Sequence, residues 1–425
     1  MTVETVVIMV VRKVGLGTLD EQFKYFEALH KEGLESVKYL KEIANKPAYD
    51  KQPKTYSISE VERIIDIPRS TIRDNESRKE ISYEDASPGS RKNAYTLKDV
   101  NILREFFNKG FFNGHCSRPE HLPPIVLATA MFKGGVGKTT QSSHLAAHCA
   151  ITGLKTLFID LDPQASGTLT LGYVPSIDLE PENTIYNALL NDPQDIVNVI
   201  KPTHYHGLDI ITSGLELQGA DILLPNFDNN NAERLGSPLL RLKKALMVEE
   251  IKKYDVILLD CAPNHAAVTM NALTAADGVI LPVTPSMLAY GSSIQFIETL
   301  KELTQTLIKY RDELRQDEGD HSEELELLNN ISNKLFTILV TNDEGNSENE
   351  DTGSAIQSLY SNHVLKQHMV HTIALPRTSN DLALLYDMKR SDIRGSKESF
   401  DRGLFCMKEV NDGILSLLKS VWGIS

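Results

Sequence analysis

The sequence has few cysteines and no long apolar run, and each absence excludes a class of protein. Its 425 residues include four cysteines, which stand far apart and form no Cys-x-x-Cys pair. That spacing argues against a disulfide framework or a zinc site and fits a reducing compartment. The longest apolar run near the start, Val6–Val11, is far shorter than the ~20 residues of a membrane-spanning helix and than the apolar core of a signal peptide. We therefore expect a cytoplasmic protein.

The negative charge is concentrated in the later part of the chain. The formal net charge is −14, which taken alone argues against a nucleic-acid-binding protein. Residues 1–115, however, carry 19 lysines and arginines against 18 acidic residues. Much of the excess lies in two acidic stretches, Asp312–Glu326 and Asp343–Asp351, which we predict to be solvated insertions or loops. The global charge thus says little about what a folded face binds.

Length and patterning predict three regions, 1–48, 49–115 and 116–425. In the first, Thr18 and Glu21 form a capping box at the start of a helix whose apolar residues recur at helical spacing. Such a helix either packs on its own domain or pairs with a second subunit in a dimer.

The second region is predicted to be a compact helical unit. Ser57 and Glu60 form a capping box, and Ile67-Pro68 ends the helix that follows. A second helix restarts at Ser70, which gives the layout helix, three-residue turn, helix. The polar stretch Tyr83–Tyr95 is suited to a wing hairpin. A further helix follows, capped by Thr96 with Asp99, and we expect its apolar residues to point inward: Leu97, Val100, Leu103, Phe106 and Phe107.

This order resembles the winged helix-turn-helix of the MerR type, on the segments YSISEVERIIDIPRSTIR and YTLKDV. In such folds the second helix enters the major groove and the wing contacts the backbone. The resemblance implies two sets of DNA contacts: Arg69, Ser70, Thr71, Arg73 and Asn75 at the groove, and Arg91 and Lys92 on phosphates. The alternative is a small packing module with ordinary surface arginines.

The third region alternates strands and helices. Short apolar runs occur at 125–131, 156–159, 208–211, 256–259, 278–283 and 335–340, with helical stretches between them. This alternation predicts an α/β fold, a parallel sheet with helices on both faces.

A phosphate-binding loop is indicated by the segment Lys133–Thr140, KGGVGKTT, which follows a strand and opens a helix. Its glycines let backbone N–H groups turn toward phosphate oxygens, and the helix N-terminus adds positive potential. We expect Lys138 to reach the β- and γ-phosphates, Thr139 to bind Mg²⁺ and Thr140 to reach the α-phosphate. The remaining members of the loop are Gly134, Gly135, Val136 and Gly137.

One departure from the standard phosphate-binding loop is informative. Phe132 stands where the first glycine belongs, and Lys133 is added, which makes the segment a deviant Walker A motif, KGGxGK[ST]. In proteins with this motif the first lysine crosses a dimer interface to the partner's nucleotide.

Three carboxylates follow predicted strands and complete the site. Asp160 and Asp260 are placed to hold the hydration shell of Mg²⁺, and Asp162 is placed to orient or activate the attacking water. For Asp162 the alternative is an N-cap of the next segment.

Together these motifs resemble the ParA family of partition ATPases, a P-loop NTPase fold. The segments FIDLDPQ, YDVILLDCAP, LPVTP and IALPRT agree over about 300 residues, and the N-terminal part is similar to long plasmid-type members such as the P1 class. The resemblance implies ATP/ADP and Mg²⁺ as cofactors, a homodimer, and slow ATP hydrolysis stimulated by DNA and a ParB-type centromere-binding partner. Asn342 would then lie against adenine.

The resemblance also implies two modes of DNA binding and a nucleoid-associated protein that separates plasmid or chromosome copies. The helix-turn-helix would bind an operator and repress the operon. The ATP-bound dimer would bind DNA without sequence preference through basic residues of the C-terminal part: Arg377, Lys389, Arg390 and Arg394.

Three alternatives differ in chemistry. A nitrogenase-reductase type requires two cysteines per subunit for a shared Fe–S cluster, and the cysteines here do not stand in that family's contexts. A MinD type requires a basic amphipathic C-terminal helix, whereas the tail Gly413–Ser425 has one lysine, so we expect no membrane binding. The third, an operator-binding repressor with ATP/ADP as a conformational switch, uses the same residues and stays open.

Overall fold

The computed structural model describes residues 19–43, 51–83, 92–226, 236–332, 334–344, 347–391, 393 and 395–424. Contacts divide the chain into two units, Met1–Lys46 and Pro47–Ser425.

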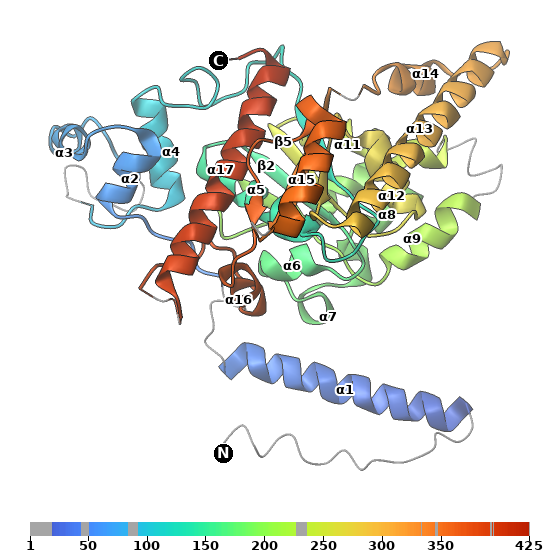
Figure 1. Ribbon diagram of the computed structural model, residues 1–425, viewed down its shortest axis with the longest axis horizontal. Helices are drawn as coiled ribbons and strands as arrows, with labels where there is room; N and C mark the ends of the chain where they lie inside the picture. The colour runs from blue at the N-terminus through green and yellow to red at the C-terminus, as the bar shows by residue number, and fades with distance from the viewer. Residues whose placement is uncertain are drawn as a thin grey trace. The chain divides into compact units, whose positions relative to one another are not determined.

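The first unit contains one helix, α1 (Leu19–Ile43), in its described part (Figure 1), which confirms the predicted helix. Its rings Phe23 and Phe26 are 67% and 55% exposed. Thr18, the expected cap, lies outside the described residues.

The centre of the second unit is an eight-stranded sheet with the order β3-β4-β2-β5-β1-β6-β7-β8. All neighbouring strands run parallel except β3, which is antiparallel to β4. The six predicted strands are confirmed. The sequence did not reveal the edge strands β3 and β8, whose three and two residues are too short for a pattern. The strands are β1 (Ile125–Thr129), β2 (Thr156–Leu161), β3 (Ile200–Pro202), β4 (Leu208–Ile211), β5 (Val256–Cys261), β6 (Gly278–Val283), β7 (Leu335–Asp343) and β8 (Met369–Val370).

Helices cover both faces of this sheet, as predicted (Figure 1). Successive side chains of a strand point to opposite faces, so Leu127 joins one apolar cluster while Val126 and Ala128 join the other. On the Leu127 side lie α5 (Lys138–Ile151) and α17 (Lys397–Trp422). The opposite side is covered by α8 (Tyr186–Leu190), α9 (Leu217–Leu223), α11 (Arg241–Leu246), α12 (Ala267–Ala275) and α13 (Met287–Gln316). The other helices are α6 (Ser166–Thr170), α7 (Pro175–Asp178), α14 (Ser322–Asn329), α15 (Ser347–Tyr360) and α16 (Ala374–Asn380).

Three further helices precede the sheet: α2 (Ile58–Ile65), α3 (Arg69–Ser77) and α4 (Leu97–Phe106). The capping boxes at Ser57 and Thr96 are confirmed. Asp66 adopts a φ of 52° at the end of α2, which turns the chain sharply toward α3. Antiparallel pairing of Tyr56 with Tyr95 joins the segment before α2 to the segment before α4. Residues 84–91 of the predicted wing lie outside the described residues.

Two details of these helices differ from the prediction. The second helix begins at Arg69, directly after Pro68, and not at Ser70, because a proline fits the position just before a helix. Phe106 is 40% exposed, since the last residue of α4 lies off the buried stripe; its ring packs edge-on against Phe107.

The core is continuous from these helices into the sheet region. Phe112 packs against Trp422 with ring centroids 5.2 Å apart. Arg104 of α4, 3% exposed, donates a hydrogen bond to the carbonyl of Ile151 at the end of α5. No break in packing therefore marks the expected boundary near residue 115.

The acidic stretches are not simple loops, which corrects that alternative; the side chains of 312–326 are mostly exposed, as predicted for a solvated segment. Asp312–Glu326 covers the end of α13 and the start of α14, and Asp343–Asp351 runs from the end of β7 into α15. In the first case the flanking helices pack on each other, since Leu307 of α13 and Leu327 and Leu328 of α14 belong to one small buried cluster.

No helix among the described residues is long and apolar enough to cross a membrane. On α17 the residues Leu415, Leu418 and Trp422 are buried in the protein core. That face of the C-terminal helix is therefore unavailable to a lipid surface, contrary to the MinD-type alternative.

Candidate nucleotide-binding site

The loop between β1 and α5 has the backbone of a phosphate-binding loop. Gly135 and Gly137 adopt φ values of +73° and +85°, in the left-handed region that favours glycine. No side chain caps α5 at Gly137, so its first N–H groups and the positive end of the helix dipole remain available to an anion.

The loop borders a cavity of about 380 Å³. Its walls come from the loop, from α5, from the segments after β2 and β5, and from residues 382–384. The sequence-predicted residues among them are Gly134, Gly135, Gly137, Lys138, Thr139, Thr140 and Asp162.

The two lysines of the loop differ in position. Lys138 is 7% exposed, its ammonium donates to the carbonyl of Lys133 over 3.1 Å, and burial lowers its pKa. Lys133 is half-buried and does not line this cavity.

Asp160 and Asp260 lie side by side. They are register partners on β2 and β5, and both are fully buried. Asp160 accepts hydrogen bonds from the N–H and hydroxyl of Thr168, each 2.8 Å long, and from the N–H of Asp162. Among the described residues neither oxygen of Asp260 has a partner of good geometry. Burial, and then the charge of Asp160, raises the pKa of Asp260, while the nearby hydroxyls of Thr139 and Ser142 oppose this only in part.

A buried carboxylate without partners is costly unless a cation offsets its charge. The carboxylates of Asp160 and Asp260 and the hydroxyl of Thr139 form an all-oxygen set, the type that Mg²⁺ prefers. The residues present therefore fit a hydrated magnesium ion beside the phosphate-binding loop.

Removing the charge of Asp260 is expected to stabilise the ligand-free protein. Folding raises the pKa of Asp260, so its carboxyl group destabilises the folded protein increasingly as the pH rises above the ordinary carboxyl pKa. Below that pH the group is protonated in both states and has no such effect. At about pH 7.5 we expect Asp260→Asn to raise the free energy of unfolding by about 1–3 kcal/mol and the melting temperature by a few degrees. Near pH 4 we expect the two proteins to be equally stable. Thermal melts of both proteins without nucleotide or metal measure this. A lower melting temperature of the variant at pH 7.5 would contradict it.

The side chain of Asp162 accepts a hydrogen bond within its own turn and also faces the cavity. Its Oδ1 accepts the N–H of Gln164 over 2.9 Å in a local turn. The next helix, α6, has Ala165 at its N-cap position and no side-chain cap, so the N-cap alternative for Asp162 is wrong. The side chain of Asp162 is half-buried and lines the cavity. The turn hydrogen bond thus fixes the carboxylate without removing it from the site.

Asn342 stands at the end of β7 with a φ of +52°. Its amide donates to the carbonyl of Gly135 over 3.5 Å, and Thr341 donates to that of Val136. The structure thus places Asn342 against the phosphate-binding loop; the adenine contact stays a prediction.

Comparisons with known proteins agree with this geometry. An AAA domain family matches residues 125–315. A putative replication protein A of Sinorhizobium fredii is 28% identical over 393 residues, 89% of each chain. SopA of Escherichia coli is 32% identical over 262 residues, 60% of this chain and 66% of SopA. The chromosome partitioning protein ParA of Myxococcus xanthus is 36% identical over 178 residues, 41% of this chain and 55% of that protein.

The chain belongs to the ParA family. A solved structure described as a partition protein has the same fold, with a TM-score of 0.54 and 19% identity over 90% of this chain and 98% of that one.

In this ParA-family protein the cysteines are poor candidates for an Fe–S cluster. Cys149 and Cys261 are fully buried, and burial raises the pKa of both thiols.

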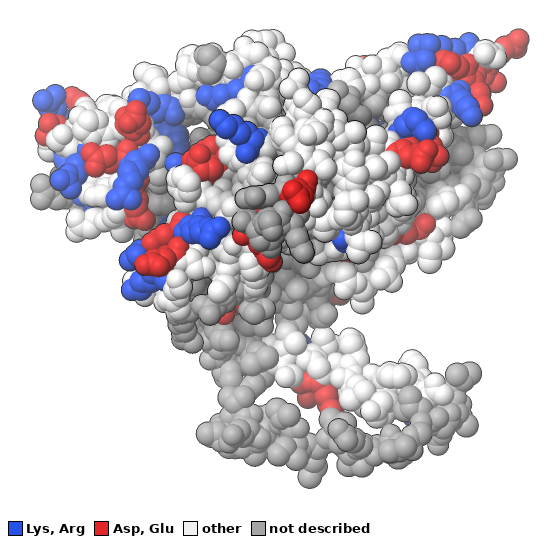
Figure 2. Space-filling view, in the orientation of Figure 1, with Lys and Arg blue, Asp and Glu red and all other residues white. Residues whose placement is uncertain are grey.

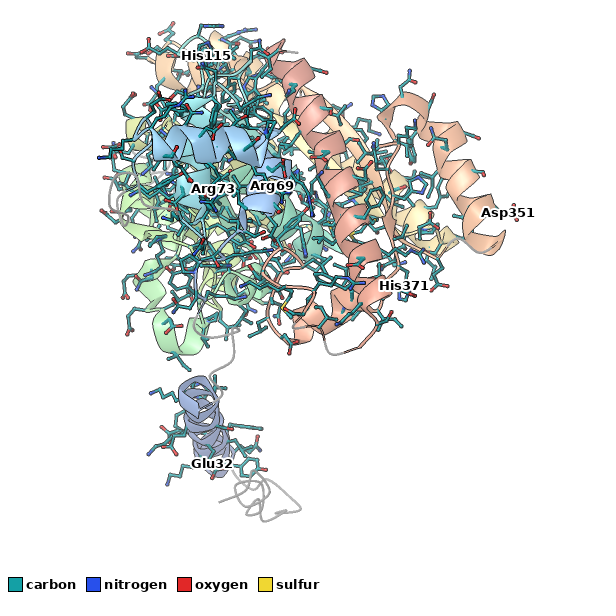
Figure 3. All side chains as sticks on the ribbon, turned by 90° about the vertical axis from the view of Figure 1, so that its left-hand side faces the viewer. Glu32, Arg69, Arg73, His115, Asp351 and His371 are labelled. Atoms are coloured by element: carbon teal, nitrogen blue, oxygen red, sulfur yellow. The ribbon has the colours of Figure 1, made fainter. Side chains whose placement is uncertain are left out.

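The candidate DNA contacts of α3 fall into two groups. Arg69, Ser70 and Thr71 are exposed at the start of the helix. Figure 3 labels Arg69 on this helix. Asn75 is half-buried and donates to the carbonyl of Thr71. Around α2–α4 Figure 2 shows lysines and arginines interleaved with acidic residues rather than a uniform basic patch.

Arg73 and Lys92 point inward, which corrects their assignment. Arg73 pairs with Glu76 at 3.0 Å, and Glu76, 3% exposed, also accepts hydrogen bonds from two buried tyrosines. The ammonium of Lys92 pairs with Asp99 at 2.8 Å, and its side chain is 9% exposed. The predicted phosphate contact of Lys92 is therefore wrong for this arrangement, because a buried acid holds the lysine inside.

The C-terminal candidates lie on and after α16. Arg377 belongs to that helix, and Lys389 and Arg390 are exposed on the segment that follows. Arg390 pairs with Asp401 at 2.8 Å. Arg91 and Arg394 lie outside the described residues.

The sequence did not point to two features of the site. One is the segment 382–384, which lines the cavity, and the other is His144 of α5, which also lines it. Neither belongs to a motif, so only the folded arrangement shows them.

Proposed function

We propose that the protein binds Mg²⁺-ATP, hydrolyses it slowly and uses the cycle to move DNA copies apart. The observation that carries this proposal is an uncapped helix N-terminus at the edge of the cavity, with a buried carboxylate close behind it. That carboxylate, Asp260, has no hydrogen-bond partner of good geometry among the described residues and lies within electrostatic reach of Lys138 and Thr139. The helix N-terminus suits phosphate and the carboxylate suits a cation. A ligand that brings both is a metal–nucleotide complex.

In the proposed reaction the protein supplies position and charge. The N–H groups of the loop and Lys138 hold the phosphates, and Thr139, Asp160 and Asp260 hold the hydrated metal. Bound Mg²⁺ would neutralise phosphate charge. Asp162, fixed by Gln164, orients the attacking water. Phosphate release measured with Mg²⁺ and with a chelator tests this: no ATP-dependent release under either condition would contradict the proposal.

The active form is proposed to be a homodimer. Lys133 does not line its own cavity, which leaves it available to a partner's nucleotide. Phe23 and Phe26 of α1 offer an exposed apolar face for the same association.

DNA binding is proposed at two places. The exposed start of α3 would read an operator, and the segment around Lys389 and Arg390, with Arg377 and Arg394, would bind DNA without sequence preference. A ParB-type partner would stimulate hydrolysis, and the protein would be cytoplasmic and nucleoid-associated. The second candidate function, a repressor switched by nucleotide, is favoured by the shared core of α4 and α5.

Alanine variants of Arg69 and Arg73 are expected to distinguish a DNA contact from a contribution to stability. Arg69→Ala removes an exposed cation, so operator affinity falls about ten-fold with unchanged stability. Arg73→Ala leaves Glu76 without its ion pair and lowers the melting temperature. Operator titrations and thermal melts of both variants measure this. Unchanged operator affinity of Arg69→Ala would refute the assignment of α3.

A further inference from the structure

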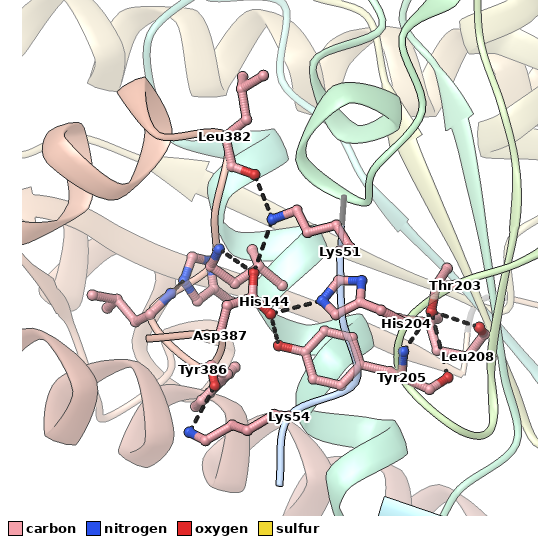
Figure 4. A network of polar contacts seen from close by, with 12 residues as sticks. Lys51, Lys54, His144, Thr203, His204, Tyr205, Leu208, Leu382, Tyr386 and Asp387 are labelled. Carbon is pink, nitrogen blue, oxygen red and sulfur yellow. Dashed lines mark hydrogen bonds and ion pairs between the residues drawn. The ribbon is translucent and has the colours of Figure 1, made fainter. Parts of the chain in front are cut away.

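One wall of the nucleotide cavity is held by a lysine from the opposite end of the chain. Leu382, Ala383 and Leu384 line the cavity across from the phosphate-binding loop. Figure 4 shows Lys51, which precedes α2, reaching this segment.

The wall segment has a strained backbone. Leu382 adopts a φ of +49°, in the left-handed region that is unfavourable for a side chain with a Cβ. Such a conformation is energetically unfavourable and persists only where surrounding contacts hold it. The position of this wall therefore depends on its contacts.

Lys51 and Asp387 supply those contacts at both ends of the segment. The ammonium of Lys51 donates to the carbonyl of Leu382 over 2.6 Å and pairs with Asp387 at 3.2 Å. Asp387 accepts the N–H of Leu384 over 2.8 Å. The side chains of Lys51 and Asp387 are 7% and 11% exposed. A Cβ on Gly172 would come within 2.9 Å of the Lys51 side chain, so the lysine stem packs closely against Gly172.

Two further anchors complete the network in Figure 4. His204 and Tyr205 hydrogen-bond to the second oxygen of Asp387, over 2.7 and 2.5 Å. Although burial alone would raise the pKa of Asp387, His204 and then Lys51 hold it well below its ordinary value. Asp387 thus stays charged and keeps its hold on Lys51 throughout the neutral range.

His144 ties the same segment to the phosphate-binding helix. Its Nε2 accepts the N–H of Leu385 over 3.0 Å, so its Nδ1 carries the proton and donates to the carbonyl of Thr140 over 2.7 Å. Burial lowers the pKa of His144 to about 4, which keeps the ring neutral and both bonds intact.

We propose that Lys51 is a positioning residue of the nucleotide site and couples its occupancy to the helices α2 and α3. This rests on the proposed function that the cavity binds an adenine nucleotide. A ligand that displaces or fixes Leu382 acts on Lys51 through their hydrogen bond, and Lys51 lies six residues before Ser57, the N-cap of α2. By linkage, whatever changes the placement of α2 changes nucleotide affinity by the same factor.

The test compares Lys51→Met with Lys54→Met in the full-length protein. Lys54 comes from the same segment and donates to the carbonyl of Tyr386 over 2.8 Å, but Tyr386 does not line the cavity. Calorimetric titration with Mg²⁺-ADP gives affinity, and amide hydrogen exchange of residues 58–77 with and without ADP gives the coupling. Lys51→Arg keeps the charge and serves as the conservative variant.

We expect Lys51→Met to bind ADP about ten-fold more weakly and to lose the ADP-dependent change in exchange of α2 and α3. Lys54→Met should behave as wild type, and Lys51→Arg should recover most of the affinity. Equal affinity and an unchanged exchange response in Lys51→Met overturn the inference, as does an equal loss in Lys54→Met. Failure of the wild type to bind ADP instead overturns the proposed function.

Discussion

Replacing Asp162 with alanine is expected to lower ATP turnover by about 100-fold or more while nucleotide affinity changes little. The carboxylate faces the cavity, and its turn hydrogen bond from the N–H of Gln164 fixes its direction. Among the described residues no hydrogen bond joins its side chain to the phosphate-binding loop, and its charge is only a secondary influence on Lys138, so we expect phosphate binding to depend little on it. Single-turnover phosphate release and an equilibrium nucleotide titration measure the two effects separately.

The chain contains a matched control for this variant. Asp192 opens the same tripeptide, Asp-Pro-Gln, and its Oδ1 accepts the N–H of Gln194 over 2.9 Å, the same distance as at Asp162. Asp192 lines a different pocket, away from the phosphate-binding loop. Asp192→Ala should therefore retain full turnover. Equal turnover in the wild type and Asp162→Ala would show that Asp162 takes no part in the reaction. Equal losses of turnover in Asp162→Ala and Asp192→Ala would show that Asp162 acts only by holding its local turn.

Replacing Lys138 with methionine is expected to weaken Mg²⁺-ATP binding by about 100-fold or more, because a phosphate oxygen loses a buried cationic partner. In the ligand-free protein the ammonium is held by the carbonyl of Lys133, and burial lowers its pKa. The same substitution should leave the ligand-free fold at least as stable, since a desolvated charge is removed. Nucleotide titration and thermal melts test the two parts.

Lys133→Met is the control from the same loop. Because Lys133 does not line the cavity of its own chain, monomeric protein should bind nucleotide with wild-type affinity, while turnover by the dimer should fall. Tight binding by Lys138→Met, or an equal loss of affinity in monomeric Lys133→Met, would contradict the assignment of the two lysines.

The parts predictable from sequence are those encoded locally. The phosphate-binding loop, the carboxylates at the strand ends and the capping boxes each occupy a few consecutive residues, and the buried strands are continuous apolar runs. Parallel strands bring Asp160 and Asp260 together once they are neighbours. The nucleotide site could therefore be predicted before the fold was known.

The parts that sequence did not reveal depend on distant contacts. Lys51 and Asp387 are 336 positions apart, and nothing near either residue indicates the other. Lys92 has a related explanation: it lies within the predicted wing, and although Asp99 is only seven positions away, the ion pair that holds the lysine inside forms only on folding. Orientation of a charged side chain is a tertiary property and has no local signal.

The most direct test of the proposed function is duplex binding by the full-length protein with ATP, with ADP and without nucleotide, on operator and random DNA. The account predicts that random DNA is bound only with ATP, that this binding weakens steeply with salt, and that operator DNA is bound in at least one state in which random DNA is not. Random-duplex affinity that is equal in all three nucleotide states would contradict the claim that ATP controls a DNA-moving cycle.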